Sequence, residues 1–280
     1  MSLWAHTIVK NEDRYLWYSV NSVINHVDKI LLWDTGSTDN TLVIIDELRK
    51  RYPSKIDFRE MGDVNIDQFT TVRQKMLDST KSDWVIIVDG DEVWWDEKIK
   101  EVRSVIETGG KDLDSIVAKY YNIVGDIYHH QDESAGKYNI DGKLGNYNIR
   151  AFNRKIKGIR FTRPHGQQAL VDDKNVFLQD RDHHKKYWIE GYSYLHFTNV
   201  QRSGKRTDDL KVPKRSFKLK YDMGHKFSPD FYYPEAFFSY KPDIVVSPWF
   251  SASYNYRIRS NVLIPLRKIK RMLGNNKSGY

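Results

Sequence analysis

Cysteine is absent from this 280-residue sequence. Its absence excludes disulfide bonds, thiolate metal sites and cysteine nucleophiles. No stretch of about 18 apolar residues occurs either, so the sequence predicts no membrane-spanning helix. The first residues lack the charged start and long apolar core of a secretory signal. We therefore expect a cytoplasmic protein, and a hydrophobic content of 40% with 14% aromatic residues is sufficient for a packed core.

Acidic residues are scarce at one end of the chain. Residues 201–280 contain 17 Lys and Arg but 6 Asp and Glu, whereas the whole chain has a formal net charge of +8. The excess of positive charge therefore belongs to the C-terminal part, and residues 1–200 are slightly acidic. A localised basic end indicates a separate role for that end, whereas a nucleic-acid-binding protein is expected to be basic more widely.

Short apolar runs alternate with segments of helical periodicity. Strands are predicted at 3–10, 29–33, 55–60, 83–88, 114–124, 146–153 and 187–197. Helices are predicted at 12–27, 41–51, 67–80 and 96–108. This alternation is typical of an α/β fold with a mainly parallel sheet flanked by helices. In such folds ligands bind beyond the carboxyl ends of the strands.

Three polar motifs follow predicted strands and therefore meet at one sheet edge. They are Lys10-Asn11-Glu12, the run Asp34 to Thr41, and Asp89-Gly90-Asp91-Glu92. Two carboxylates so close together repel each other unless a cation neutralises them. Mg²⁺ or Mn²⁺ prefers few protein carboxylates together with substrate phosphates. The motifs therefore predict a metal and diphosphate site at Asp89 and Asp91, with Gly90 allowing close approach of a ligand.

Asp34 and Arg73 are further candidates for this site. Asp34 ends an apolar strand and can accept hydrogen bonds from a base or ribose, while Ser37 to Asp39 are good N-caps for the next helix. Arg73 lies on the helix before the metal strand, from which a guanidinium can bind a diphosphate or a sugar hydroxyl. An exposed surface role is an equal alternative for Arg73.

The run IVKNEDRYLWYSV…DKILLWDTGSTDNT…TVRQKMLDSTKSDWVIIVDGDE resembles the family 2 glycosyltransferases of the GT-A fold, in the branch with a Lys-Asn-Glu turn. The resemblance covers residues 3 to about 95. It implies a Rossmann-like sheet, a nucleotide diphosphate sugar as donor (a UDP-sugar is favoured) and inversion at the anomeric carbon. It also implies Mn²⁺ or Mg²⁺ as cofactor, and a hexosyltransferase-like enzyme of polysaccharide biosynthesis.

The resemblance also assigns roles to individual residues. It implies that the nucleoside is held by Thr7, Val9, Asn11 and Asp34. It implies that Asp89 and Asp91 flank the metal and diphosphate, with Arg73 nearby. A late histidine often binds the metal in such enzymes, and His196 in Tyr194-Leu195-His196-Phe197 matches that pattern, although a structural role is as common for a lone histidine.

Inversion requires a base that takes a proton from the acceptor hydroxyl. The branch often shows a His-Glu pair downstream, but here Arg163-Pro164-His165-Gly166-Gln167 keeps the histidine without the glutamate. We predict His165 or Asp126 as the base. Trp94 and Trp95 follow the metal motif directly, so at least one of them is expected to stack on a donor or acceptor sugar.

The predicted organisation is a catalytic domain at 1–200 and a basic helical and aromatic extension at 201–280. Within the domain, 1–95 is the nucleotide-binding half and 96–200 the acceptor half. The acceptor is a glycan, a lipid-linked sugar or a protein. Residues 258–273 combine an apolar stripe with cations. This pattern fits a peripheral contact with an anionic membrane, or a helix packed on the domain, and Pro265 is expected to interrupt a single helix.

Two other functions compete with sugar transfer. A nucleotidyltransferase also uses acidic metal sites on a parallel sheet, but Asp34-Thr35-Gly36-Ser37 is a poor phosphate loop. A nucleic-acid-binding protein would use the basic C-terminal part, but no nucleic-acid motif is recognisable. We therefore expect no nucleic-acid partner.

Overall fold

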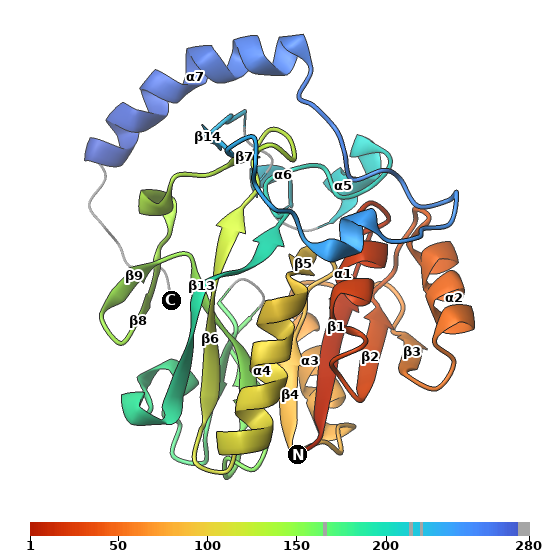
Figure 1. The fold of residues 1–280 in the computed structure, drawn as a ribbon, viewed down its shortest axis with the longest axis vertical. Coiled ribbons are helices and arrows are strands. Elements are labelled where there is room, and N and C mark those ends of the chain that lie inside the picture. The colour runs from red at the N-terminus through yellow and green to blue at the C-terminus, as the bar shows by residue number, and fades with distance from the viewer. Residues whose placement is uncertain (165–166, 213–214, 219–220, 274–280) are drawn as a thin grey trace.

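The computed structural model describes residues 1–164, 167–212, 215–218 and 221–273. Its centre is an eight-stranded sheet in the order β3-β2-β1-β4-β10-β6-β13-β5 (Figure 1). The strands are β1 (Leu3–Val9), β2 (Lys29–Asp34), β3 (Ile56–Glu60), β4 (Trp84–Ile87), β5 (Glu92–Trp94), β6 (Ser115–Asn122), β10 (Tyr147–Asn153) and β13 (Lys186–His196). β1 to β4 pair in parallel, β10 is antiparallel to both neighbours, and β13 is parallel to β6. The predicted mainly parallel α/β sheet is confirmed.

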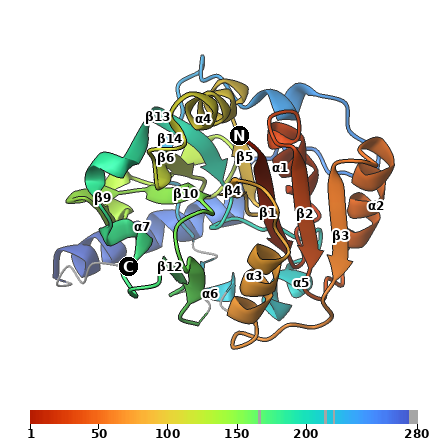
Figure 2. The same cartoon turned by 90° about the horizontal axis from the view of Figure 1, so that it is seen from below.

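Helices cover both faces of this sheet (Figure 2). The covering helices are α1 (Leu16–Val23), α2 (Thr41–Arg51), α3 (Phe69–Asp78) and α4 (Asp96–Gly109). Three further helices, α5 (Arg206–Lys211), α6 (Arg215–Lys218) and α7 (Tyr254–Leu273), lie away from the sheet faces (Figure 1). α1 and α4 bury apolar side chains against one face, where Leu16, Val20, Ile99 and Val102 join the largest core cluster. On the opposite face α3 packs Val72 and Met76 in a second cluster. Strands buried on both faces explain the continuous apolar runs of β1 and β2.

Smaller elements surround the second half of the sheet. Short hairpins and pairs are formed by β7 (His129–His130) with β14 (His225–Lys226), β8 (Tyr138–Ile140) with β9 (Lys143–Gly145), and β11 (Arg160–Thr162) with β12 (Ala169–Val171). Four 3₁₀ turns complete the described chain: η1 (Glu133–Ala135), η2 (Leu178–Asp180), η3 (His183–Lys185) and η4 (Glu235–Phe238). In the part of the chain that is described, no helix is both long and apolar enough to span a membrane.

Three details differ from the predicted elements. α1 begins at Leu16 instead of residue 12, because the residues before it form a turn held by other loops. β5 was not predicted, since three residues are too few to show a period. The expected break at Pro265 is wrong: α7 continues from Tyr254 to Leu273. A proline removes one hydrogen bond of the helix and crowds the carbonyl group four residues before it, but the hydrogen bonds of the turns on either side can still continue the helix.

A buried histidine makes the fold sensitive to acid. The Thr80 hydroxyl donates to the Met76 carbonyl, so His6 Nε2–H donates to Thr80 Oγ1 at 2.7 Å and Nδ1 carries no proton. Nδ1 is buried without a partner. Burial, together with the charge of Arg73, lowers the pKa of His6 from 6.5 to about 3. The fold therefore favours neutral His6.

We expect protonation of His6 to lower the free energy of unfolding as the pH falls. Its folded pKa lies below its unfolded pKa, so its contribution is complete above pH 6.5 and is lost progressively toward pH 3. Between pH 7 and pH 5 this loss is about 2 kcal/mol, at about 1.4 kcal/mol per pH unit below the unfolded pKa. Glu12, whose pKa is raised to about 8, titrates in the opposite sense in both proteins. In urea unfolding the free energy of the wild type should therefore fall by about 2 kcal/mol more between pH 7 and pH 5 than that of His6→Gln. Equal pH slopes in the two proteins would contradict this account.

Candidate functional site

The three predicted motifs meet at one cavity beyond the carboxyl ends of β1 and β4. This cavity has a volume of about 610 Å³. Its wall includes Val9, Glu12, Arg73, Asp89, Gly90, Asp91, Arg150, His196, Arg202 and Arg215. The register of β1 between β2 and β4 brings these strand ends side by side, which is why the motifs converge. Asp89, Asp91 and several arginines therefore surround this one cavity.

Asp89 is held by two arginines. Arg73 Nη2 donates to its Oδ1 at 2.7 Å, and Arg150 Nη1 donates to its Oδ2 at 3.4 Å. Burial alone would raise the pKa of Asp89, but the two guanidinium charges lower it to about 2. Arg150 also pairs with the fully buried Glu92. Asp89 is therefore ionised and fixed at neutral pH.

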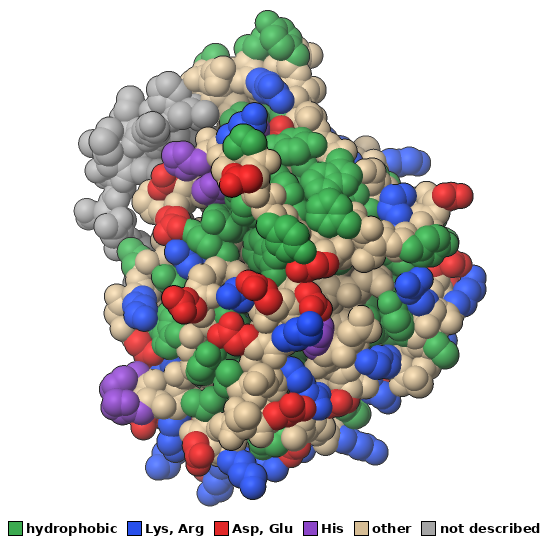
Figure 3. Space-filling view, in the orientation of Figure 1, with side chains coloured by type: hydrophobic (Ala, Val, Ile, Leu, Met, Phe, Trp, Pro, Cys, Tyr) green, Lys and Arg blue, Asp and Glu red, His purple; other side chains and the backbone are tan. Residues whose placement is uncertain are grey.

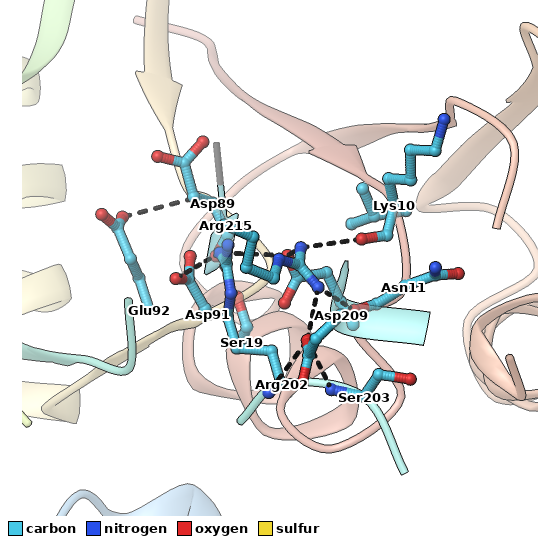
Figure 4. A network of polar contacts seen from close by, with 12 residues as sticks. Lys10, Asn11, Ser19, Asp89, Asp91, Glu92, Arg202, Ser203, Asp209 and Arg215 are labelled. Atoms are coloured by element: carbon cyan, nitrogen blue, oxygen red, sulfur yellow. Dashed lines mark hydrogen bonds and ion pairs between the residues drawn. The ribbon is translucent and has the colours of Figure 1, made fainter. Parts of the chain in front are cut away.

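Asp91 is held by a cation from far along the chain (Figure 4). Arg202 Nη1 donates to Asp91 Oδ2 at 2.6 Å, and His196 Nε2 lies 3.5 Å from the same oxygen. Burial would raise the pKa of Asp91, but Arg202 and His196 keep it well below its usual range. Burial lowers the pKa of His196, which favours the neutral imidazole that binds metal ions.

The donor set fits a divalent cation that takes its other ligands from a substrate. Asp91 and His196 offer a carboxylate and an imidazole nitrogen at neighbouring positions on the cavity wall. Mg²⁺ and Mn²⁺ use few protein ligands when phosphate oxygens are available. Among the described residues, three such protein donors within 4.8 Å of one another occur at Asp182, His183 and His184, which are exposed and do not line the cavity.

The nucleoside-side candidates lie around the first strand end. Val9 lines the cavity, whereas Thr7 is buried inside the sheet with an unpartnered hydroxyl. Asn11 has a φ of 55° and its Oδ1 accepts from Thr38 N at 2.7 Å. Asp34 Oδ2 accepts from the backbone N–H groups of Gly36 and Ser37, while its buried Oδ1 has no partner. Asp34 thus stabilises the turn through Oδ2, while its Oδ1 accepts no hydrogen bond from the protein.

Gly90 is required by packing within the motif. A Cβ at this position would lie 2.9 Å from Val9 Cγ1 and 3.1 Å from Glu12 Cγ. Gly90 also lines the cavity, so close approach of a ligand at this position stays a prediction. Gly90 lets the Asp89–Asp91 turn pack directly against the end of β1.

Not all predicted residues reach this cavity. Asp126 is fully buried and does not line it: Oδ1 accepts from Tyr128 N and His129 Nδ1, and Oδ2 accepts from Ala252 N. These bonds hold its own loop, which does not support a role as base. His165 lies outside the described residues. Trp94 is fully buried and stacks on Tyr194, with the two ring centroids 4.9 Å apart. Its ring therefore belongs to the core, where a sugar cannot contact it.

Trp95 lies at a second hollow, of about 620 Å³. Its lining combines aromatic rings, carboxylates and one lysine, namely Trp95, Tyr121, Tyr192, Phe231, Tyr232, Asp96, Glu97, Glu235 and Lys100. In Figure 3 hydrophobic side chains gather on this face, around β5 and η4. Only Trp95, of the two tryptophans, is therefore placed where a bound molecule can touch it.

Sequence reasoning missed Arg150, Arg202 and Arg215. Arg150 comes from β10, and the other two belong to the predicted basic extension at 201–280. Their carboxylate partners in the predicted motifs, Glu92, Asp91 and Glu12, lie 58, 111 and 203 residues away along the chain, so no local pattern joins them. One signal was available: a buried acidic motif needs cations, and Arg202 follows His196 by only six residues.

The strand order and the cavity define an α/β protein of the GT-A type, whose acidic motif lies at the carboxyl end of the sheet. Residues 5–188 match the family model described as Glycosyl transferase family 2, and the chain belongs to this family.

Relatives with curated names agree with this family. An uncharacterized glycosyltransferase of Rickettsia felis is 26% identical over 198 residues, which cover 70% of this chain and 62% of the relative. The glycosyltransferase SunS of Bacillus phage SPbeta is 28% identical over 49% of this chain and 31% of its own length. The chain thus spans less than two thirds of these relatives.

A solved structure shares the fold. S. aureus TarS 1-349 in complex with UDP-GlcNAc superposes with a TM-score of 0.51 at 13% identity, covering 78% of this chain and 69% of TarS. At this identity the likeness concerns the fold alone.

Proposed function

We propose that this chain transfers a sugar from a nucleoside diphosphate sugar, a UDP-sugar in first place, to an acceptor hydroxyl with inversion at the anomeric carbon. One observation carries the proposal: Asp89, Asp91, Arg73 and His196 line a single cavity at the end of the parallel strands. Family membership supports sugar transfer over nucleotidyl transfer at an acidic site of this kind.

The protein's own groups have distinct tasks in this proposal. Asp91 and His196 would hold Mn²⁺ or Mg²⁺, which when bound stabilises negative charge on the leaving diphosphate. Arg73 and Arg150 fix Asp89 beside it. Thr7, Val9, Asn11 and the free oxygen of Asp34 stay our predicted contacts to the nucleoside. Preorganised charges of this type lower the barrier because they need no rearrangement during the reaction.

The reaction can be tested with UDP-, GDP- and dTDP-sugars, Mn²⁺ and a panel of glycan acceptors. We expect release of free nucleoside diphosphate, measured by chromatography. In the product, the anomeric proton coupling seen by NMR should show the opposite configuration to the donor. Release of pyrophosphate would point to nucleotidyl transfer instead, and a retained configuration would refute inversion.

We further propose that residues 1–200 are the main part of the catalytic domain, that Arg202, Arg215 and Lys218 of the basic extension at 201–280 complete its cavity, and that this extension contacts an anionic membrane through α7. This helix contains six Lys and Arg residues and no acidic residue. Tyr254, Ile258 and Val262 follow each other at a spacing of four and are 78%, 46% and 65% exposed. Figure 1 shows α7 at the margin of the molecule. Apolar and cationic groups together bind anionic lipid surfaces, which would suit a lipid-linked acceptor.

Co-sedimentation with phosphatidylglycerol vesicles at low salt tests the membrane contact. We expect the wild type to sediment with the vesicles, and the double variant Ile258→Ser with Val262→Ser to lose roughly tenfold in binding, because each buried methylene contributes about 0.8 kcal/mol. Leu144→Ser, another exposed apolar site, is the matched control. Absence of wild-type binding at low salt would refute this contact.

A further inference from the structure

Part of the cavity is built by a segment beyond the family match. The match ends at residue 188, yet Arg202, Arg215 and Lys218 line the cavity together with the acidic motif. These three cations come from α6 and from the loop before α5. Membership of the family therefore does not by itself account for their presence at the site.

The arginines form one continuous chain of ion pairs (Figure 4). Arg215 Nη2 donates to Glu12 Oε1 at 2.5 Å, and Arg202 Nη1 lies 3.1 Å from the same oxygen. Arg202 Nη1 also donates to Asp91 Oδ2 at 2.6 Å. The Lys-Asn-Glu turn and the acidic motif are thus joined through a guanidinium group placed between two carboxylates.

Asp209 fixes this arrangement from behind. It is fully buried, and its Oδ1 accepts from Arg215 Nη1 at 2.9 Å and from the backbone N–H of Ser203 at 3.2 Å. Arg215 additionally donates to the carbonyl oxygens of Lys10 and Asn11. The two arginines are therefore held in place without a ligand, as a preorganised site requires.

The cavity carries more positive than negative charge. Among the described residues its wall has seven Lys and Arg side chains (Lys10, Arg73, Lys137, Arg150, Arg202, Arg215 and Lys218) and three carboxylates (Glu12, Asp89 and Asp91). Glu92, Asp209 and Asp63 add three further carboxyl groups as partners of Arg150, Arg215 and Lys10. Seven cations face six carboxyl groups, so the cavity keeps an excess of positive charge. Uncompensated charge away from water is costly, so an anion is favoured there.

Several guanidinium donors have no acceptor. Arg73 Nη1, Arg202 Nε and Arg215 Nε are buried nitrogen atoms without a hydrogen-bond partner. The three arginine residues are buried, with relative exposures of 6%, 9% and 2%. Buried donors of charged groups that lack an acceptor cost free energy. The positive charge of these arginines is therefore only partly compensated by the protein, which also favours an anion in the cavity.

We propose that Arg202, Arg215 and Lys218 form an anion site that binds the donor diphosphate without a divalent cation. That this diphosphate belongs to a sugar donor rests on the proposed function; the site itself accepts a diphosphate group, whether free or esterified. Asp91 and the diphosphate compete for Arg202, because Arg202 bonds Asp91 Oδ2 when no anion is bound. The anion site therefore lies next to the position that we propose for the cation, at Asp91 and His196.

Calorimetric titration of inorganic pyrophosphate into the full chain in excess EDTA tests this site. We expect wild-type binding and a loss of roughly tenfold or more in Arg202→Gln, because hydrogen bonds between charged groups are about twice as strong as neutral ones. Asp91→Asn should bind pyrophosphate more tightly in EDTA, since it releases Arg202 and removes a negative charge. Lys100→Gln, a cation 64% exposed on α4, is the matched control and should bind as the wild type does.

Four outcomes decide the proposal. Wild-type protein that is folded by circular dichroism yet binds no pyrophosphate in EDTA overturns it. So does unchanged binding in Arg202→Gln, or weaker binding in a folded Asp91→Asn. If Arg202→Gln does not fold, Lys218→Gln replaces it and must weaken binding for the proposal to stand.

The same titrations separate this site from the proposed function. Sugar transfer with Mn²⁺ but no pyrophosphate binding in EDTA would overturn the anion site alone. Pyrophosphate binding in EDTA without affinity for any nucleotide sugar would support the anion site and refute the donor assignment.

Discussion

Asp91→Asn should reduce kcat/KM for sugar transfer by about 10³-fold, which corresponds to ~4 kcal/mol of transition-state stabilisation. The substitution keeps the shape of the side chain but removes the charge that binds the cation next to the leaving diphosphate. Arg202 keeps Glu12 as a partner at 3.1 Å, so the fold should survive. Initial rates in Mn²⁺, measured as nucleoside diphosphate release, test this expectation.

A matched substitution controls for a general effect of losing a carboxylate. Asp46 is 59% exposed on α2, and its carboxylate pairs with Arg49 at 3.2 Å. Asp46→Asn should therefore leave kcat/KM within a factor of about two, as expected for surface changes. Near-normal activity of Asp91→Asn would remove Asp91 from the reaction.

Trp94→Ala should lower the free energy of unfolding by about 3–5 kcal/mol, the usual range for truncating a buried tryptophan. Trp94 is fully buried at the end of β5 and stacks on Tyr194, so truncation leaves a cavity between β5 and β13. At roughly 2–4 °C per kcal/mol, the melting temperature should fall by roughly 10 °C. Urea unfolding measures the effect directly.

Tyr232→Ala is the control for this prediction. Tyr232 lies at the rim of the second hollow and is 63% exposed, so its truncation should change stability by less than about 0.5 kcal/mol. A Trp94→Ala protein of normal stability with a raised KM for the acceptor would contradict the core assignment. It would return Trp94 to the acceptor site that we predicted from its position after the acidic motif.

The elements that the sequence predicts well are those whose apolar period is set locally. β1, β2, α2 and β4 were found close to their observed bounds, because strands buried on both faces and an amphipathic helix leave strong patterns. β5 has three residues and is held by β13 through pairs such as Leu195 with Val93, which only the folded chain brings together.

The acidic residues of the candidate site could be predicted from the sequence. Asp89 and Asp91 could be placed because a strand ends directly before them and parallel strand ends meet at one edge. The compensating arginines could not be placed, since Arg202 and Arg215 reach Asp91 and Glu12 through loops distant in sequence. Interpreting the basic residues after 200 only as a separate extension concealed their role at the cavity.

One measurement tests the central claim most directly: a thermal-shift scan of UDP-, GDP- and dTDP-sugars with and without Mn²⁺. A ligand that binds the folded state raises the melting temperature by mass action. We predict a shift with one nucleotide class, larger in Mn²⁺, and loss of this Mn²⁺-dependent increase in Asp91→Ala. Absence of a shift with every donor, in protein shown to be folded, would contradict the assignment of this cavity as a nucleotide-sugar site.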